Sequence, residues 1–306
     1  MKTRLLVLTG TPPPPPGVSP DQQGFTRADL LAVLGVAGLL AGLFLPALAG
    51  TATGSAGAGC LNNLRQLTRA LLQFAEDHDG WFPKNPDDGS QYNWVGGAGG
   101  AGIGQLSEFN TDAPGDPATS ALAPYLNRKA ATFHCPADLR VGLYQGTNAA
   151  WRGRFVPAAR SYSMSCAVGT KGEGTNRVGT APVDGGWLDG YHRNYHNQPW
   201  RTYGRPSHIV EPSPAGLFVF LDEDPVSLND GNFSMSMLPA EKTKWVDWPA
   251  TYHNFGVGLG YADGRAELHA WQDSRTRLPT PPRFNYLLPH NPDVTWLQAR
   301  TSARAY

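Results

Sequence analysis

Oxygen-bearing side chains are concentrated in one acidic segment, residues 222–230, and they are the first candidates for chemistry. Calcium takes about 6–8 oxygen ligands, which carboxylates and amides can supply. The segment lacks the Asp-x-Asp-x-Asp-Gly spacing of an EF-hand loop. Two interpretations stay open: an ordinary solvated turn, or a calcium site whose ligands are Asp222, Asp224, Asn229 and Asp230.

A histidine-based site is the second candidate, made of His253, Asp263 and His269. The sequence fixes no geometry for these groups, because a residue at the start of a hairpin can lie far from one in its turn. We expect His253 to hydrogen-bond within a sheet, with a metal or acid–base role as the alternative. The chain has no Gly-x-Ser-x-Gly elbow and no phosphate-binding loop, so the sequence does not predict an enzyme.

The three cysteines, Cys60, Cys135 and Cys166, form no Cys-x-x-Cys pair. A zinc ribbon and a thioredoxin-type motif are therefore excluded. In an oxidising compartment, three cysteines allow one disulfide and leave one thiol.

Composition describes a neutral, loop-rich chain. The 306 residues carry 25 basic and 25 acidic side chains, which argues against a nucleic-acid-binding protein with its basic excess. The 36 glycines and 27 prolines indicate many turns, and the nine tryptophans can hold long loops to a core.

An apolar run at residues 28–50 carries one charged side chain, Asp29. It is long enough to cross a membrane, since about 20 helical residues suffice. Basic residues precede the run and the next one after it is Arg65, so the larger C-terminal part is expected outside the cytoplasm. The alternative is a secretory signal peptide cleaved after Ala49, although its apolar region is usually shorter and nearer the start.

The junction before this run reads Gly24, Phe25, Thr26, followed by Leu30 and Leu31. It resembles the processing site of type IV pilins and pseudopilins, where cleavage falls between Gly and Phe. Arg27 and Ala28 depart from the family's apolar pair, and Asp29 stands where the family has Glu.

The resemblance implies a leader over residues 1–24, removed by a prepilin peptidase, and an assembly helix over 25–50. It also implies that the new amine on Phe25 pairs with Asp29 of a neighbouring subunit in a fibre. The simpler role for Asp29 is an N-cap that stabilises its own helix.

The segment from Cys60 to Pro83 resembles the helix of a planctomycete and verrucomicrobial group of pilin-like proteins. Matches extend to a Cys-Pro-x-Asp segment at Cys135 and to the His-x9-Asp-Gly pattern of His253, Asp263 and Gly264. Since Cys60 and Cys135 both belong to family-like segments, the resemblance implies a disulfide between them.

Periodicity supplies the expected elements. Leu61, Leu64, Leu67, Leu71 and Phe74 predict an amphipathic helix over 60–78. Residues 51–59 are expected to form a flexible hinge, because each glycine weakens a helix by roughly 0.5–1 kcal/mol. Strands are expected near 160–166, 216–222, 256–262 and 265–271, the last two as a hairpin.

The sequence therefore predicts an α+β, pilin-like fold: an N-terminal transmembrane helix, then an amphipathic helix packed on an antiparallel sheet with long loops in a domain over 60–306. The implied function is a pseudopilin subunit of a type II secretion or type IV pilus-like system. It would be a single-pass inner-membrane protein with its C-terminal domain in the periplasm or exterior, and its partners would be the peptidase and other pilin-like subunits. The alternative is a membrane-tethered extracytoplasmic binding protein that uses exposed Trp94, Trp187 or Trp245.

Overall fold

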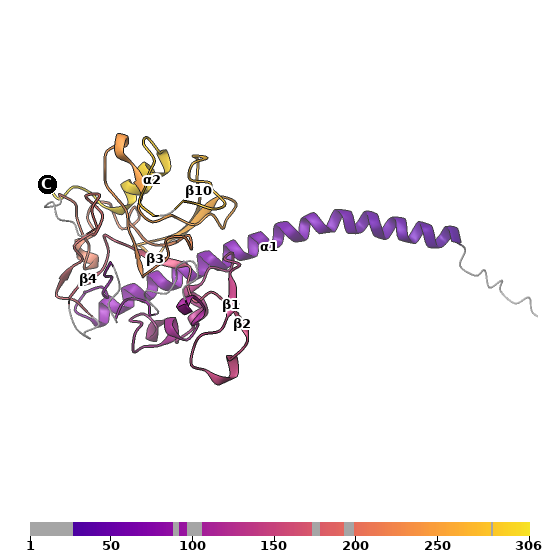
Figure 1. Cartoon of the computed structure of the whole chain (residues 1–306), viewed down its shortest axis with the longest axis horizontal. Helices are drawn as coiled ribbons and strands as arrows, with labels where there is room; N and C mark the ends of the chain where they lie inside the picture. Colours follow the sequence, from indigo (N-terminus) through magenta and orange to yellow (C-terminus); the bar gives the residue numbers. More distant parts are fainter. Residues whose placement is uncertain (1–26, 88–91, 97–105, 173–177, 193–198, 283) are drawn as a thin grey trace, which may run out of the picture. The chain divides into compact units, whose positions relative to one another are not determined.

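The computed structural model describes residues 27–87, 92–96, 106–172, 178–192, 199–282 and 284–306, except for the side chains of residues 37–53. The chain divides into two compact units, Met1–Gly50 and Thr51–Tyr306. This boundary coincides with the end of the predicted hydrophobic helix. The elements of each unit can be followed in Figure 1.

Helix α1, Arg27–Asp77, runs through both units. In the first unit its apolar side chains are exposed; these are Leu30, Leu31, Val33, Leu34 and Val36. Among the residues whose side chains are described, no helix combines the length and the apolar character needed to cross a membrane. The predicted span covered residues 25–50, of which 25–26 and the side chains of 37–50 lie outside the described part.

The C-terminal part of α1 confirms the predicted amphipathic helix. Leu64, Leu67, Leu71 and Phe74 are buried. The helix stops where Asp79 and Gly80 take positive φ angles, the left-handed conformation that closes many helices.

The structure continues helix α1 through residues 51–59, the stretch for which a flexible hinge was predicted. A Cβ at Gly57 would lie 3.1 Å from Leu268 Cδ1, and one at Gly59 would lie 3.0 Å from Pro136 Cγ. These two glycines therefore let the helix pass close to the rest of its domain, and burial there offsets their low helix propensity.

The central sheet has five strands in the order β10–β9–β6–β3–β7. It contains the four predicted strands, as β3 Tyr162–Ser165, β6 Phe218–Asp222, β9 Gly256–Tyr261 and β10 Ala266–Ala270. Their pairings are antiparallel. The sequence did not predict β7, Asn232–Phe233, which is only two residues long and pairs parallel with β3.

The hairpin between β9 and β10 is confirmed. Gly264 has φ +89°, and Asp263 accepts a hydrogen bond from the Arg265 amide through its side chain. Both residues of the Asp-Gly pair thus serve the turn.

Helices cover both faces of the sheet. On one face, Gly258 and Gly260 of β9 lie against Leu64 of α1, and Leu268 of β10 lies against Gly57. On the other face, the His269 ring stacks on Trp296 of α2, Pro292–Thr301, with ring centroids 3.6 Å apart. Neighbouring strand residues point to opposite faces, so the sheet lies between α1 and α2.

Among the described residues, three two-stranded sheets lie outside the central sheet. They pair β1 Val141–Leu143 with β2 Phe155–Pro157, β4 Thr170–Lys171 with β5 Ala181–Pro182, and β8 Lys244–Trp245 with β11 Tyr286–Leu287. The 3₁₀ turns are η1 Leu106–Phe109, η2 Ala113–Gly115, η3 Pro124–Leu126, η4 Ala130–Phe133, η5 Ala149–Trp151, η6 Pro206–His208 and η7 Ala240–Lys242. Short elements and turns make up most of this α+β domain, as its glycine and proline content predicted.

Tryptophans hold these loops to the core. Trp94 is buried and donates from Nε1 to the Gly231 carbonyl at 2.8 Å, and Trp245 is buried with its ring edge-on to Trp271. The expectation that Trp94 and Trp245 are exposed is therefore wrong, because their apolar area is used in packing.

Candidate metal centre

Four potential metal ligands converge inside the second unit. Cys60 comes from α1, Cys135 follows η4, Asp222 ends β6, and His253 lies just before β9. The thiol, carboxylate and imidazole ligand atoms all lie within 4.8 Å of one another. Within the described residues, this is the one group of three or more Cys, His, Asp or Glu side chains that meets this condition.

The separations between ligand atoms are short. The Cys60 sulfur lies 3.5 Å from Asp222 Oδ2, the Cys135 sulfur lies 3.4 Å from His253 Nε2, and His253 Nε2 lies 3.2 Å from Asp222 Oδ2. The site is closed, since the Asp222 side chain is 0% exposed and the His253 side chain 5%. Both cysteines are buried.

The segment that carries Cys135 is fixed by backbone and side-chain hydrogen bonds. Its own amide donates to Ser161 Oγ at 3.1 Å, and Ser161 Oγ donates to Asp138 at 2.7 Å. From α1, Asn63 donates to the His134 carbonyl at 2.9 Å. Helix α1 therefore positions Cys135 as well as its own Cys60.

Strand β9 supports the carboxylate. The Gly258 amide donates to Asp222 Oδ2 at 2.8 Å. A Cβ at Gly258 would lie 2.6 Å from the Cys60 sulfur and 2.9 Å from Asp222 Oδ2. Only a glycine leaves room here for both side chains.

Neighbouring groups in the cluster shift one another's pKa values. The hydrogen bond between the two thiols raises the pKa of Cys60 and lowers the pKa of Cys135. Burial opposes the charged ring of His253, but its hydrogen bonds to Asp222 and Cys135 raise the pKa of His253 to about 10. Cys135 is thus the thiol that loses its proton first, beside a protonated imidazole.

The arrangement is not that of a nucleophilic triad. In such a triad the carboxylate orients the histidine through one ring nitrogen, and the nucleophile uses the other. Here Asp222 and Cys135 both approach Nε2 of His253. Convergence on one nitrogen fits a shared central cation better than a proton relay.

The predicted calcium set is not brought together. Asp222 belongs to the cysteine–histidine cluster, whereas Asp224 accepts from the Val226 amide and Asp230 from the Asn232 amide through their side chains. These two carboxylates close turns of their own loop, and no tight group of Asp222, Asp224 and Asp230 exists among the described residues. The structure therefore does not bring these carboxylates together as the ligands of a local calcium loop.

The predicted disulfide is not formed, since all three cysteines are free thiols. Cys60 and Cys135 are nevertheless close, as the resemblance implied, with their sulfurs within 4.8 Å. His253 does hydrogen-bond within the domain, although its partners are Asp222 and Cys135. Asp263 and Gly264 lie in the hairpin turn, and His269 stacks on Trp296 on the opposite face.

Sequence reasoning therefore named all four cluster residues but assigned them to three separate roles. The available signal was that Cys60, Cys135 and His253 all belong to the segments that carried the second resemblance. Asp222 had no such signal.

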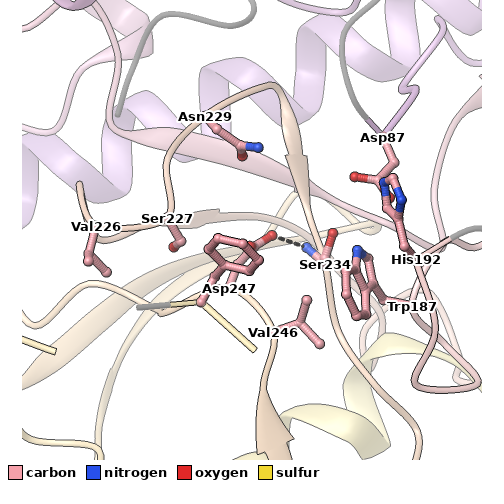
Figure 2. Close-up of a pocket in the computed structure, with 10 residues that line it drawn as sticks. Asp87, Trp187, His192, Val226, Ser227, Asn229, Ser234, Val246 and Asp247 are labelled. Atoms are coloured by element: carbon pink, nitrogen blue, oxygen red, sulfur yellow. Dashed lines mark hydrogen bonds and ion pairs between the residues drawn. The ribbon is translucent and has the colours of Figure 1, made fainter. Parts of the chain in front are cut away.

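A separate cavity of ≈ 470 Å³ contains Asn229 of the predicted calcium set and Trp187 of the predicted binding tryptophans. Figure 2 shows Trp187 beside His192, and Asp247 joined to the Ser234 amide by a hydrogen bond of 2.6 Å. His192 Nε2 lies 3.4 Å from Asp87 Oδ2. Of the three tryptophans proposed for binding, Trp187 lines this cavity.

The proposed processing residues Gly24 and Phe25 lie outside the described residues. Asp29 lies in the first turn of α1 and is exposed. No protein-family model, curated protein or solved structure matches the chain.

Proposed function

We propose that this chain is a pilin-like subunit of a type II secretion or type IV pilus-like system, acting by membrane anchoring and assembly and not by catalysis. The observation that carries the proposal is the apolar N-terminal stretch of α1, where Leu30, Leu31, Val33, Leu34 and Val36 are each at least 53% exposed. Five large apolar side chains exposed within seven residues need a lipid or protein partner.

The second support is the architecture of the chain. The same helix continues into an α+β domain and packs there along a mainly antiparallel sheet. The exposed N-terminal part of such a helix can insert into a membrane or an assembly, while its C-terminal part stays packed in the domain. The proposed partners are a prepilin peptidase, the inner membrane and other pilin-like subunits.

A membrane-tethered extracytoplasmic binding protein is the second candidate, favoured by the cavity at Trp187. Its aromatic ring and the carboxylates Asp87 and Asp247 suit a small polar ligand. This function would reside in the domain and would not require assembly.

N-terminal sequencing of the full-length protein recovered from cell membranes tests the first proposal. We expect the mature protein to begin at Phe25. When Gly24 is replaced by a bulky residue, we expect this cleavage to be lost. A mature N-terminus after Ala49 would instead identify a secreted protein and refute the pilin-like function.

A further inference from the structure

We propose that Cys60, Cys135, Asp222 and His253 bind one Zn²⁺ ion in a closed, tetrahedral, structural site. This inference does not depend on the proposed assembly function. It explains why two thiols, a carboxylate and an imidazole meet at one buried point.

The distances carry the proposal. With zinc–sulfur bonds of about 2.3 Å and zinc–nitrogen or zinc–oxygen bonds of about 2.1 Å, ligand atoms at the corners of a tetrahedron lie about 3.4–3.8 Å apart. All six separations in the cluster are within 4.8 Å, and three of the six are 3.2, 3.4 and 3.5 Å. Each of these three lies within about 0.2 Å of the value for its own atom pair in such a tetrahedron.

The donor set selects the metal. Two sulfurs with one imidazole nitrogen and one carboxylate oxygen suit zinc, whereas calcium and magnesium prefer oxygen alone. Four protein ligands leave no open coordination position, and the burial of Asp222 and His253 leaves little access for water. The site is therefore structural and not catalytic.

The charges of the four ligands are compatible with an ion at this point. Zinc takes both cysteines as thiolates, and two thiolates beside a carboxylate would be costly to bury without the cation. Zinc binding releases the thiol protons and the imidazole proton, and the divalent charge then offsets both thiolates. The Gly258 amide already donates to Asp222 Oδ2, which holds the oxygen in position.

The ligands also come from parts of the chain that are far apart. Cys60 and Asp222 are 162 residues apart, and Cys135 and His253 are 118 apart. One ion would thus tie α1 to the Cys135 loop, the central sheet and the loop before β9. In a domain with many short elements, such a cross-link restricts opening of the loops, so metal binding should be coupled to folding.

The test uses the full-length chain, purified with a reductant and stripped of metal by a chelator. Zinc is returned and its content is measured by mass spectrometry, and Co²⁺ is added in parallel as a spectroscopic substitute. The variants are Cys135→Ser and His253→Gln. The matched control is Cys166→Ser, which removes a buried thiol outside the cluster whose hydrogen bond goes to the Met235 carbonyl.

We expect one zinc per chain, a higher unfolding temperature with zinc, and a cobalt spectrum with thiolate charge transfer and strong tetrahedral bands. Cys166→Ser should keep all three properties, and Cys135→Ser and His253→Gln should lose them. The cobalt spectrum of the unmodified chain supports the site even if a ligand variant fails to fold.

Three results would overturn the proposal. These are an unmodified chain that binds neither ion, a six-coordinate cobalt spectrum, and loss of the spectrum in a Cys166→Ser variant that circular dichroism shows to be folded. Intact mass measured without reductant gives a further check, because a Cys60–Cys135 disulfide in freshly isolated protein would show that the pair is oxidised and not a metal ligand.

Discussion

Gly258→Ala probes the contact between strand β9 and helix α1 directly. The new Cβ would lie 2.6 Å from the Cys60 sulfur, 2.9 Å from Asp222 Oδ2 and 2.9 Å from Leu64 Cδ1. Favourable contacts between carbon atoms need about 3.5–4.0 Å, so the neighbours must move by roughly 1 Å. Gly258 does not have a positive φ, so the effect is one of space and not of backbone strain.

The expected cost is at the upper end of overpacking, about 3 kcal/mol. For a domain of this size, 1 kcal/mol shifts the unfolding temperature by about 2–4 °C, so the variant should unfold about 6–12 °C lower. Because the displaced atoms include two proposed ligands and the Gly258 amide that supports Asp222, zinc affinity should fall by about 10–100-fold.

Gly260→Ala is the matched control, two residues along the same strand. Its Cβ would meet Thr68 Oγ1 at 3.0 Å but nothing in the cluster. We expect a loss of about 1 kcal/mol at most and unchanged metal binding. Thermal unfolding followed by near-ultraviolet circular dichroism, with the cobalt spectrum of each variant, measures both effects. If Gly258→Ala unfolds and binds cobalt like the parent, the close packing of β9 on α1 is refuted.

Three further predictions concern other parts of the chain. Asp29→Ala should spare processing yet impair assembly, and Asp29→Glu should be tolerated. Crosslinking of the two variants in cells measures assembly, and normal assembly of Asp29→Ala would leave Asp29 only a favourable charge in the first turn of α1. Burial raises the pKa of Asp247 well above its usual range, and the nearby carboxylates of Glu223, Asp230 and Asp87 raise it further, although the Ser234 amide opposes them. The folded state therefore keeps the Asp247 proton at pH values where the unfolded chain, above about pH 4, releases it. The stability that protonated Asp247 contributes to the folded state is lost as pH rises through its folded-state pKa. Asp247→Asn should show a smaller decline in unfolding temperature from pH 4 upward, and an unchanged pH profile would contradict the burial argument. Asn291 caps α2 by accepting from the Asp293 and Val294 amides, so Asn291→Ala should cost about 1 kcal/mol in denaturant unfolding, and a loss confined to a few tenths would mean that the cap contributes little.

Local pattern predicted the packed part of α1 and four of the five strands of the central sheet. The leucine spacing located the packed part of α1, and alternating apolar residues located β9 and β10. The Asp263-Gly264 pair located their turn. These features depend on residues only a few positions apart in the sequence, so the sequence alone can predict them. Helix α2 was missed, although Asn291 followed by Pro292 is a start signal for a helix.

The glycines show where local reasoning fails. Gly57 and Gly59 lie in the stretch that was predicted to be a hinge, and no separate role was predicted for Gly258. In the structure all three lie at close approaches between α1 and the rest of its domain. Lack of a Cβ permits both flexibility and close packing, and only the tertiary neighbours decide between them.

The candidate site was decided in the same way. The sequence by itself determined that Cys60, Cys135, Asp222 and His253 are present, and the spacing of the cysteines excluded a local zinc motif. Their convergence depends on how α1 lies on β9 and how the Cys135 loop is held by Ser161 and Asn63. Each ligand is positioned by a different element, so this long-range packing produces no periodic pattern in the sequence. Only the tertiary structure brings the four side chains to one point.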